Sequence, residues 1–336
     1  MAVQTHRWRL AWLLVAVGVL VLVVLASVAV GTRSIPVGTV LDALVHPSAT
    51  EDAHAVVRSL RVPRTVVGLL AGAALGLAGA VMQGVTRNPL ADPGLLGVSA
   101  GASFALVLGI SVLGLTGPVA YVWFAFAGAA VASVLVYGLG AIGSGGATPV
   151  KLALAGAAIT AFLLSMTTAM LLLDQRTLDE YRFWSVGSVA GRDPDLIAQL
   201  GPFVAVGALL ALAAGPVLNA LALGDDVARS LGRRVGLARV TAAVSVVLLV
   251  GAATALAGPI GFVGLTIPHV ARAITGPDYR WVLPWSMVLA PMLLLGSDVI
   301  GRVVARPGEL QVGIVTAVIG APFFVMLVRQ RRLAEL

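Results

Sequence analysis

The chain has 336 residues, of which 59% are hydrophobic and 11% charged, and its mean hydropathy is +1.01. These values are far from those of a soluble globular domain and indicate an integral membrane protein. The formal net charge is +7 and cysteine is absent, which excludes a disulfide framework, a thiolate metal ligand and a catalytic thiol.

The apolar runs predict an all-α fold, because lipid offers no partner for unsatisfied backbone groups and a spanning helix needs about 20 apolar residues. The first run is longer than the apolar core of a signal peptide, so we expect an uncleaved anchor. No linker rich in Pro, Ser or charge divides the chain, which favours a single transmembrane permease domain over residues 1–336. Ten spans are predicted, at 11–30, 64–84, 93–113, 118–139, 149–173, 197–216, 238–257, 260–275, 282–300 and 311–328.

The distribution of Lys and Arg predicts the orientation, because short cytoplasmic segments retain basic residues. With both termini in the cytoplasm, more than half of the 22 basic residues fall in inner loops. The positive net charge therefore follows from membrane topology, and no nucleic-acid partner is needed to explain it. In this topology the four spans from 64 to 173 begin outside and the last four begin inside, which predicts two inverted four-helix units.

The segment 61–101 interrupts the apolar sequence with Arg, Asn, Asp, Pro and Gly. Pro63 predicts a turn between Arg61 and Arg64, outside the membrane and just before the second span. The two arginines either anchor the helix at lipid headgroups or bind an acidic surface of an external protein. Three glycines at helical spacing then allow another backbone to approach the span closely: Gly72, Gly76 and Gly79. The NPLADPG sequence that follows predicts a tight, rigid inner loop.

The longest inner loop includes the region 218–236 and predicts a short helix. Asp225 and Asp226 near its start, and Arg229 in its later turn, suit the helix dipole. An apolar stripe at i, i+1, i+4 and i+8 makes this helix amphipathic: Val227, Ala228, Leu231 and Val235. Such a helix in the cytoplasm needs an apolar partner, which is either the lipid headgroup region or another protein.

The sequence contains few motifs typical of catalysis, metal binding or ATP binding. The four histidines form no HExxH pair, and the only lysine, Lys151, lies in PVKL, so the chain has no Walker loop for ATP. We expect no catalytic residue, no metal site and no cofactor in this chain. The densest hydroxyl group within a span is on 149–173, and its members either bond to preceding helical carbonyls or line a pathway: Thr160, Ser165, Thr167 and Thr168.

Four long motifs in this order support a family resemblance: RVPRTVVGLLAGAALGLAGAVMQGVTRNPLADPGLLGVSAG, GDDVARSLG, GPIGFVGLTIPHVARAITGPDYR and RPGELQVGIVTAVIGAPFFVMLVRQRR. Together they resemble the permease subunits of bacterial ABC importers for ferric siderophores, haem and cobalamin. The resemblance covers nearly the whole chain. It is specific for the family and much less specific for the substrate.

The resemblance implies a type II ABC importer permease of about ten helices, with the pathway at a dimer interface. The implied partners are membrane lipid, two copies of a cytoplasmic ABC ATPase that bind ATP and Mg, a second permease subunit, the same or homologous, and an external substrate-binding protein, expected to be a lipoprotein. Ser165 and Thr168 are expected to line the pathway. The docking residues for the binding protein would be Arg61, Arg64 and Arg302. The ATPase-coupling residues would be Asp225, Asp226, Val227, Ala228, Arg229, Ser230, Leu231 and Gly232.

The expected function is import of an iron chelate across the bacterial cytoplasmic membrane by a multi-pass subunit with both termini inside, and the expected chelate is a ferric siderophore. The chain itself is not expected to be an enzyme. A haem or cobalamin permease is the alternative within the family. An ion-coupled secondary carrier or a membrane enzyme is the alternative from a different class, and each would need an ion site or a catalytic set that the spans do not show.

Overall fold

The computed structural model describes residues 2–46, 48, 51–143 and 148–329, and within these ranges every regular element is helical. Each predicted span coincides with a helix. These helices are α1 (Ala2–Ala29), α4 (Val62–Thr86), α5 (Val98–Ser111), α6 (Pro118–Ala141), α7 (Pro149–Leu173), α9 (Pro194–Ala213), α12 (Val235–Ala257), α13 (Val263–Thr275), α14 (Tyr279–Val304) and α15 (Val312–Arg329). The shorter elements are α2 (Val37–Val45), α3 (Asp52–Ala55), the π-helix η1 (Val56–Arg61), the 3-10 helix η2 (Pro93–Leu96), α8 (Gln175–Ser185), α10 (Gly215–Ala222) and α11 (Asp225–Ser230).

Seven helices of the described chain are long and apolar enough to cross a membrane, and the other three predicted spans are the shorter helices α5, α13 and α15. Two of these are shortened by left-handed backbone. Gly97, with φ 70°, separates η2 from α5, so the span expected at 93–113 is helical as one piece only from Val98. Phe262, with φ 67°, precedes α13, so the span expected from residue 260 begins at Val263.

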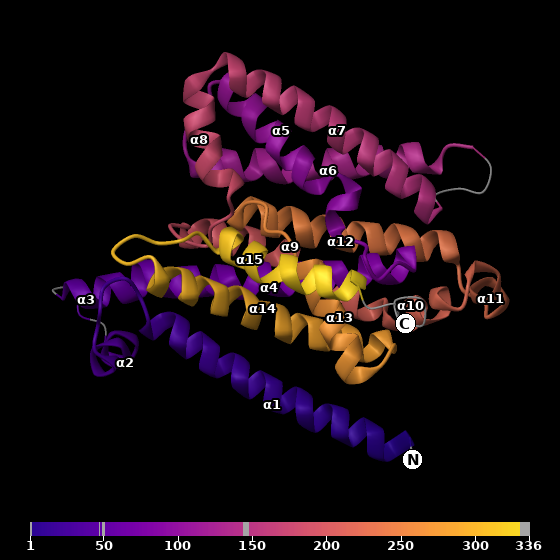
Figure 1. Cartoon of the computed structure of the whole chain (residues 1–336), viewed down its shortest axis with the longest axis horizontal. Coiled ribbons are helices and arrows are strands. Elements are labelled where there is room, and N and C mark those ends of the chain that lie inside the picture. Colours follow the sequence, from indigo (N-terminus) through magenta and orange to yellow (C-terminus); the bar gives the residue numbers. More distant parts are fainter. Residues whose placement is uncertain (1, 47, 49–50, 144–147, 330–336) are drawn as a thin grey trace.

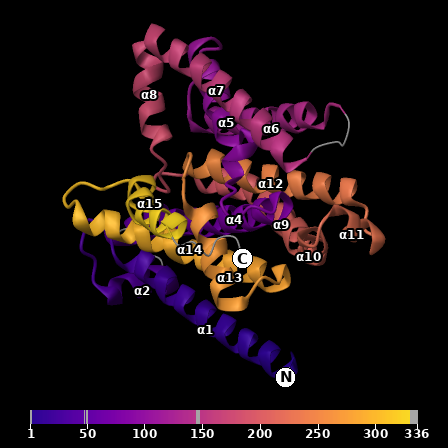
Figure 2. The same cartoon turned by 45° about the vertical axis from the view of Figure 1, so that its right-hand side comes forward.

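The helices form two groups, which both views of the cartoon separate (Figures 1 and 2). α5, α6, α7 and α8 lie together above a larger group that contains α4, α9 and α12 to α15, with α1 along its lower edge. α4 packs against α9, α12, α13 and α14, and it is the most buried of the seven long helices. A movement of α4 would therefore be transmitted to most of the larger group.

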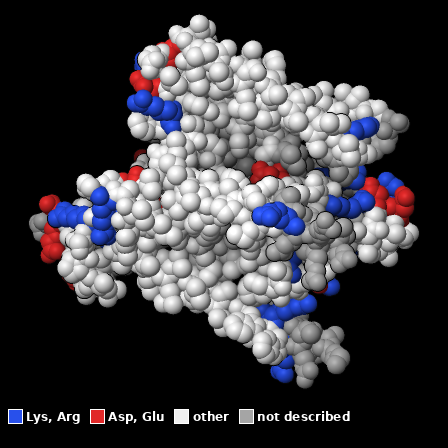
Figure 3. Space-filling view, in the orientation of Figure 1, with Lys and Arg blue, Asp and Glu red and all other residues white. Residues whose placement is uncertain are grey.

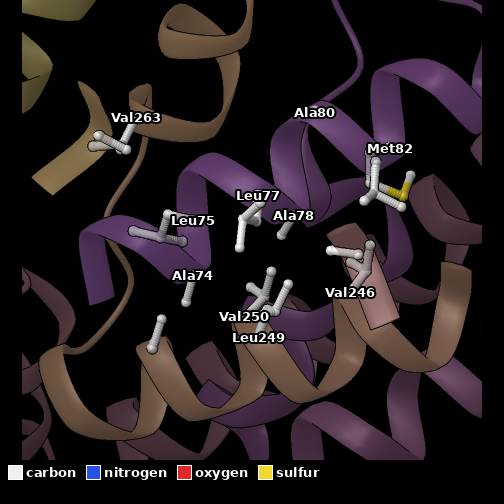
Figure 4. Packing of buried hydrophobic residues seen from close by; sticks show 14 of the residues in the cluster. Ala74, Leu75, Leu77, Ala78, Ala80, Met82, Val246, Leu249, Val250 and Val263 are labelled. Carbon is white, nitrogen blue, oxygen red and sulfur yellow. The ribbon is translucent and has the colours of Figure 1, made fainter. Parts of the chain in front are cut away.

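The small residues of α4 explain its central position. A Cβ on Gly72 would lie 2.6 Å from the Pro291 Cα, and one on Gly76 would lie 2.5 Å from the Ser286 carbonyl oxygen, while Gly79 meets the backbone of Gly264. The predicted close approach of another backbone is confirmed. On the opposite side of α4, Figure 4 shows Leu77 facing α12, where it joins a hydrophobic core rich in alanine.

The predicted turn at Pro63 is wrong. The helix runs without a break from Asp52 through η1 into α4. The π-helical winding just before Pro63 moves the Val62 N–H to the Val57 carbonyl, five residues back. A local π-helical adjustment of this kind lets a helix pass a proline, which has no N–H to donate. The NPLADPG loop is tight as predicted, since Asn88 Oδ1 accepts the Leu90 N–H at 2.9 Å and Asp92 Oδ1 accepts the Gly94 N–H at 2.8 Å.

Candidate functional site

Charged side chains gather mainly towards the two ends of the long helices, and the surface between the ends is largely uncharged (Figure 3). α2, α3 and the α14–α15 connection lie at one end, whereas α10, α11 and the α13–α14 connection lie at the other (Figure 1). We name the first the outer end and the second the inner end, after the predicted topology. The docking and coupling residues predicted from the sequence fall at opposite ends.

At the outer end, two arginines close the last turn of α1, where helical carbonyls have no partner within the helix. Arg302 Nη1 donates to the carbonyls of Ser27 at 2.8 Å and Val30 at 2.7 Å. Arg61 Nη1 donates to the two carbonyls between them, at 3.1 and 2.6 Å. Positive charge at this end of a helix is also favoured by the helix dipole. Arg61 and Arg302 thus cap α1.

A buried carboxylate joins Arg302 to Arg64 of α4. Asp298 Oδ2 accepts from Arg302 Nη2 at 2.5 Å, and Asp298 Oδ1 accepts from Arg64 Nη2 at 2.7 Å. The remaining edge of the Arg64 fork points to the surface, where Nη1 donates to Glu309 Oε2 at 2.7 Å. One carboxylate shared by two guanidinium groups satisfies the condition under which buried charge is tolerated, namely pairing with good geometry.

The three predicted docking arginines therefore differ in how accessible their guanidinium groups are to an external partner. Arg61 and Arg302 are buried, with 4% and 1% exposure, and both donate to backbone carbonyls within the chain. Of the three, Arg64 alone pairs with an exposed carboxylate, that of Glu309. Sequence reasoning missed both acids. Asp298 carried a usable signal, because it lies four residues before Arg302 inside an apolar span, where an acid needs a partner.

At the inner end, α11 is bounded by Gly224 and Gly232, whose φ angles of 107° and 76° favour glycine. The predicted apolar stripe is only partly correct. Leu231 is 59% exposed and Val227 is also exposed, but Ala228 is fully buried. Val235 is buried too, because α11 ends at Ser230 and Val235 already belongs to α12. The outward apolar face of the segment therefore consists of Val227 and Leu231.

Asp225 ties this short helix to two long ones. Its Oδ2 accepts from Arg239 Nη2 of α12 at 2.8 Å, and its Oδ1 accepts from Arg87, which directly follows α4. The neighbouring Asp226 pairs only locally in the described chain, with Arg229 at 2.7 Å, and its side chain is 98% exposed. The two adjacent aspartates thus differ in position: one is an anchor to the bundle and the other faces solvent.

A second anchor links α10 to α14. Asn219 Nδ2 donates to Asp278 Oδ1 at 2.6 Å, and Asn219 Oδ1 accepts the Tyr279 N–H at 2.8 Å. Burial acts to raise the pKa of Asp278, but the hydrogen bonds from Asn219 and Arg280 outweigh burial and lower this pKa below its ordinary value. The ionised carboxylate therefore holds the segment before α11 against the start of α14.

Ser165 and Thr168 lie on an exposed face of α7, whereas Thr167 is buried. The Thr168 hydroxyl donates to the Leu164 carbonyl at 2.9 Å, which is the local bond expected for a hydroxyl on a helix. This bond leaves the Thr168 side chain at the surface. The exposed face of α7 is thus available to a pathway or to another subunit.

Apolar helices that carry charged anchors at both ends define a multi-pass membrane protein. The chain belongs to the FecCD transport family, whose model matches residues 19–330. It is 45% identical over 317 residues to the ferric enterobactin transport system permease protein FepD of Escherichia coli (strain K12), a match that covers 94% of each chain. It is 43% identical over 277 residues to the Fe(3+)-citrate import system permease protein YfmD of Bacillus subtilis (strain 168), covering 82% of each.

The fold is also that of a solved transporter. The structure of an inward-facing conformation of a metal-chelate type ABC transporter superimposes with a TM-score of 0.82 at 26% sequence identity, covering 96% of this chain and 99% of that one. The predicted family and the all-α architecture of an ABC importer permease are confirmed. The inverted relation of the two four-helix units stays a prediction.

Proposed function

We propose that this chain is the permease subunit of an ATP-driven importer that carries a ferric siderophore across the bacterial cytoplasmic membrane. The observation that carries this proposal is the similarity to FepD over 94% of both chains, with no large segment left unmatched. Both termini lie in the cytoplasm in this proposal, as the distribution of basic residues predicts. The chain supplies the pathway, and ATP and Mg bind to a separate ATPase.

The inner end supports ATPase coupling through residues 225–232. Val227 and Leu231 present the apolar surface that a protein groove would cover, and the glycines at the two boundaries shape the turns. Asp225 then transmits a displacement of α11 to α4 and α12, while Asn219 transmits it to α14. A protein partner accounts for these anchors better than lipid headgroups do, because lipid binding requires no rigid connection to the central helix.

The outer end supports docking of a substrate-binding protein. Arg64 offers a guanidinium edge to an acidic side chain, and Arg61 and Arg302 support it indirectly by holding the end of α1 beside it. A second permease subunit would cover the exposed face of α7. Ser165 and Thr168 would then line the pathway between the subunits.

Uptake measured with a panel of labelled chelates tests the proposal. A strain that lacks the gene for this chain should lose uptake of one class of ferric siderophore and regain it when the gene is restored. Loss of haem or cobalamin uptake instead would select the alternative within the family. Uptake that continues after ATP depletion but stops when the ion gradient is dissipated would identify a secondary carrier and reject the proposal.

A further inference from the structure

A cavity of about 250 Å³ opens at the outer end, between the segment that follows α1, the start of α4 and the α14–α15 connection. Its charged lining consists of four arginines and one carboxylate: Arg33, Arg61, Arg64, Arg302 and Glu309. Asp298 lies behind Arg64 and Arg302 and neutralises part of this charge. Two carboxylates therefore face four guanidinium groups, and the cavity keeps an excess of positive charge that suits an acidic ligand.

The cations of this cavity are not equally available. Arg61 and Arg302 are buried and bound to backbone carbonyls of α1. Arg64 uses one edge of its guanidinium group on the buried Asp298 and the other on Glu309. Arg33 is exposed. Among the three arginines that hold α1, α4 and α14 together, Arg64 is thus the one whose second edge can accept an incoming carboxylate without breaking a buried contact.

The Glu309 side chain can leave Arg64 without a change in the surrounding backbone. Glu309 lies in the connection between α14 and α15, outside any helix, and its side chain is 35% exposed. In the described chain its carboxylate pairs with Arg64 alone. The backbone beside it is held independently, since the Leu310 N–H donates to the Gly301 carbonyl at 3.1 Å. A change of side-chain rotamer is therefore enough to free Arg64 while the connection stays in place.

We propose that Glu309 occupies the docking edge of Arg64 in the free permease, and that an acidic side chain of the external binding protein displaces it on docking. This inference rests on the proposed docking function of the outer end. Docking then exchanges one ion pair for another, so the number of ion pairs hardly changes. Glu309 therefore lowers the affinity of the permease for the binding protein, and this affinity depends only weakly on salt concentration.

The experiment compares Glu309→Gln with Glu51→Gln in the assembled permease and ATPase complex in lipid nanodiscs. The probe is the purified substrate-binding protein whose gene neighbours that of this chain, and Kd is measured over a series of NaCl concentrations. Both substitutions remove one outer negative charge, but Glu51 pairs with His54 and does not contact Arg64. We expect Glu309→Gln to bind about two- to fivefold more tightly at low salt, which is the scale of an exposed ion pair. We also expect a steeper salt dependence than in the wild type or in Glu51→Gln, because docking then forms a net new pair.

Arg64→Gln and the charge-conserving Arg64→Lys separate the two levels of inference, with thermal unfolding recorded to confirm that each complex is folded. If both folded variants keep wild-type affinity, Arg64 is not part of the surface that binds the substrate-binding protein, and the proposed docking function of the outer end is rejected. If they weaken docking while Glu309→Gln matches Glu51→Gln in affinity and salt dependence, Arg64 does bind the partner. The proposed displacement of Glu309 is then overturned. Weaker docking by Glu309→Gln would also overturn it, since Glu309 would then be positioning Arg64 for the partner.

Discussion

Arg302 donates to the Asp298 carboxylate at 2.5 Å within α14, one helical turn away, while its other nitrogen holds the end of α1. The pair is nearly inaccessible to solvent. An ion pair at this depth is maintained because all three guanidinium nitrogens of Arg302 donate and both oxygens of Asp298 accept hydrogen bonds. Its first role in this fold is to join α1 to α14, and the proposed docking surface lies next to that junction.

Replacing Arg302 with Met should destabilise the permease by about 3 kcal/mol, because Asp298 keeps only Arg64 and the Ser27 and Val30 carbonyls lose their partner. The measurement is thermal unfolding of the purified chain in detergent. Adding Asp298→Leu should recover part of the loss, since Arg64 then pairs with Glu309 alone instead of with two carboxylates. Arg306→Gln is the matched control: it removes one hydrogen bond, to the Gly31 carbonyl at 2.8 Å, and should cost about 1 kcal/mol or less.

Gly79→Ala should lower stability by about 1 to 3 kcal/mol, because the added methyl group meets the Gly264 backbone and α4 must move away from α13. Gly18→Ala on α1 is the control, since no atom lies within 4 Å of the added carbon and alanine favours the helix. Folded yield and apparent unfolding temperature should fall for the first variant only. Equal behaviour of the two would show that α4 and α13 are not held in close contact.

Asp225→Asn should reduce ATP-driven uptake at least about fivefold while the ATPase still assembles and hydrolyses ATP, because the anchor between α11, α4 and α12 is weakened. Uptake and hydrolysis are measured on the same proteoliposomes, so that their ratio reports coupling. Asp226→Asn, which changes an exposed neighbour of the same charge, should lower the ratio much less, because Asp226 pairs only with Arg229 of its own helix. An equal loss of coupling in both variants would attribute the effect to charge at the ATPase surface instead.

Cysteine labelling can test the pathway residues, because the chain has no native cysteine and single substitutions give no background. Ser165→Cys and Thr168→Cys should react with a membrane-impermeant thiol reagent, and transported chelate should slow the reaction. Thr167→Cys, at a buried position on the same helix, should react much more slowly. If the first two react only with a lipid-soluble reagent, the exposed face of α7 borders lipid and these residues are not in the pathway.

Much of the fold could be predicted because the positions of the helices follow from contiguous apolar segments of the sequence. Apolar length locates the helices, and the glycine spacing of α4 identifies the face on which another backbone approaches. The boundaries of α5 and α13 could not be predicted in the same way, because a single left-handed residue, Gly97 or Phe262, decides where each helix begins. The uninterrupted helix through Pro63 was missed for a related reason, since π-helical winding has no clear sequence pattern.

The candidate sites, too, could be predicted only in part from the sequence. The aspartates and glycines of the α11 segment are visible as a motif, yet only the packed structure distinguishes Asp225, which binds Arg87 and Arg239, from the solvent-facing Asp226. The arginines at the outer end are visible as well. Their partners were not predictable, because Arg64 and Asp298 are 234 positions apart in the chain.

By itself, the sequence determined that this protein is helical and membrane-embedded, which family it belongs to, and which segments carry its charges, since these properties follow from composition and from contiguous motifs. The tertiary structure decided which charges are free to act. Two of three similar arginines became buried caps of α1, and the third kept one edge at the surface. The reason is physical: the availability of a charged group depends on which distant carbonyls and carboxylates reach it, and only the packing of the helices brings them together.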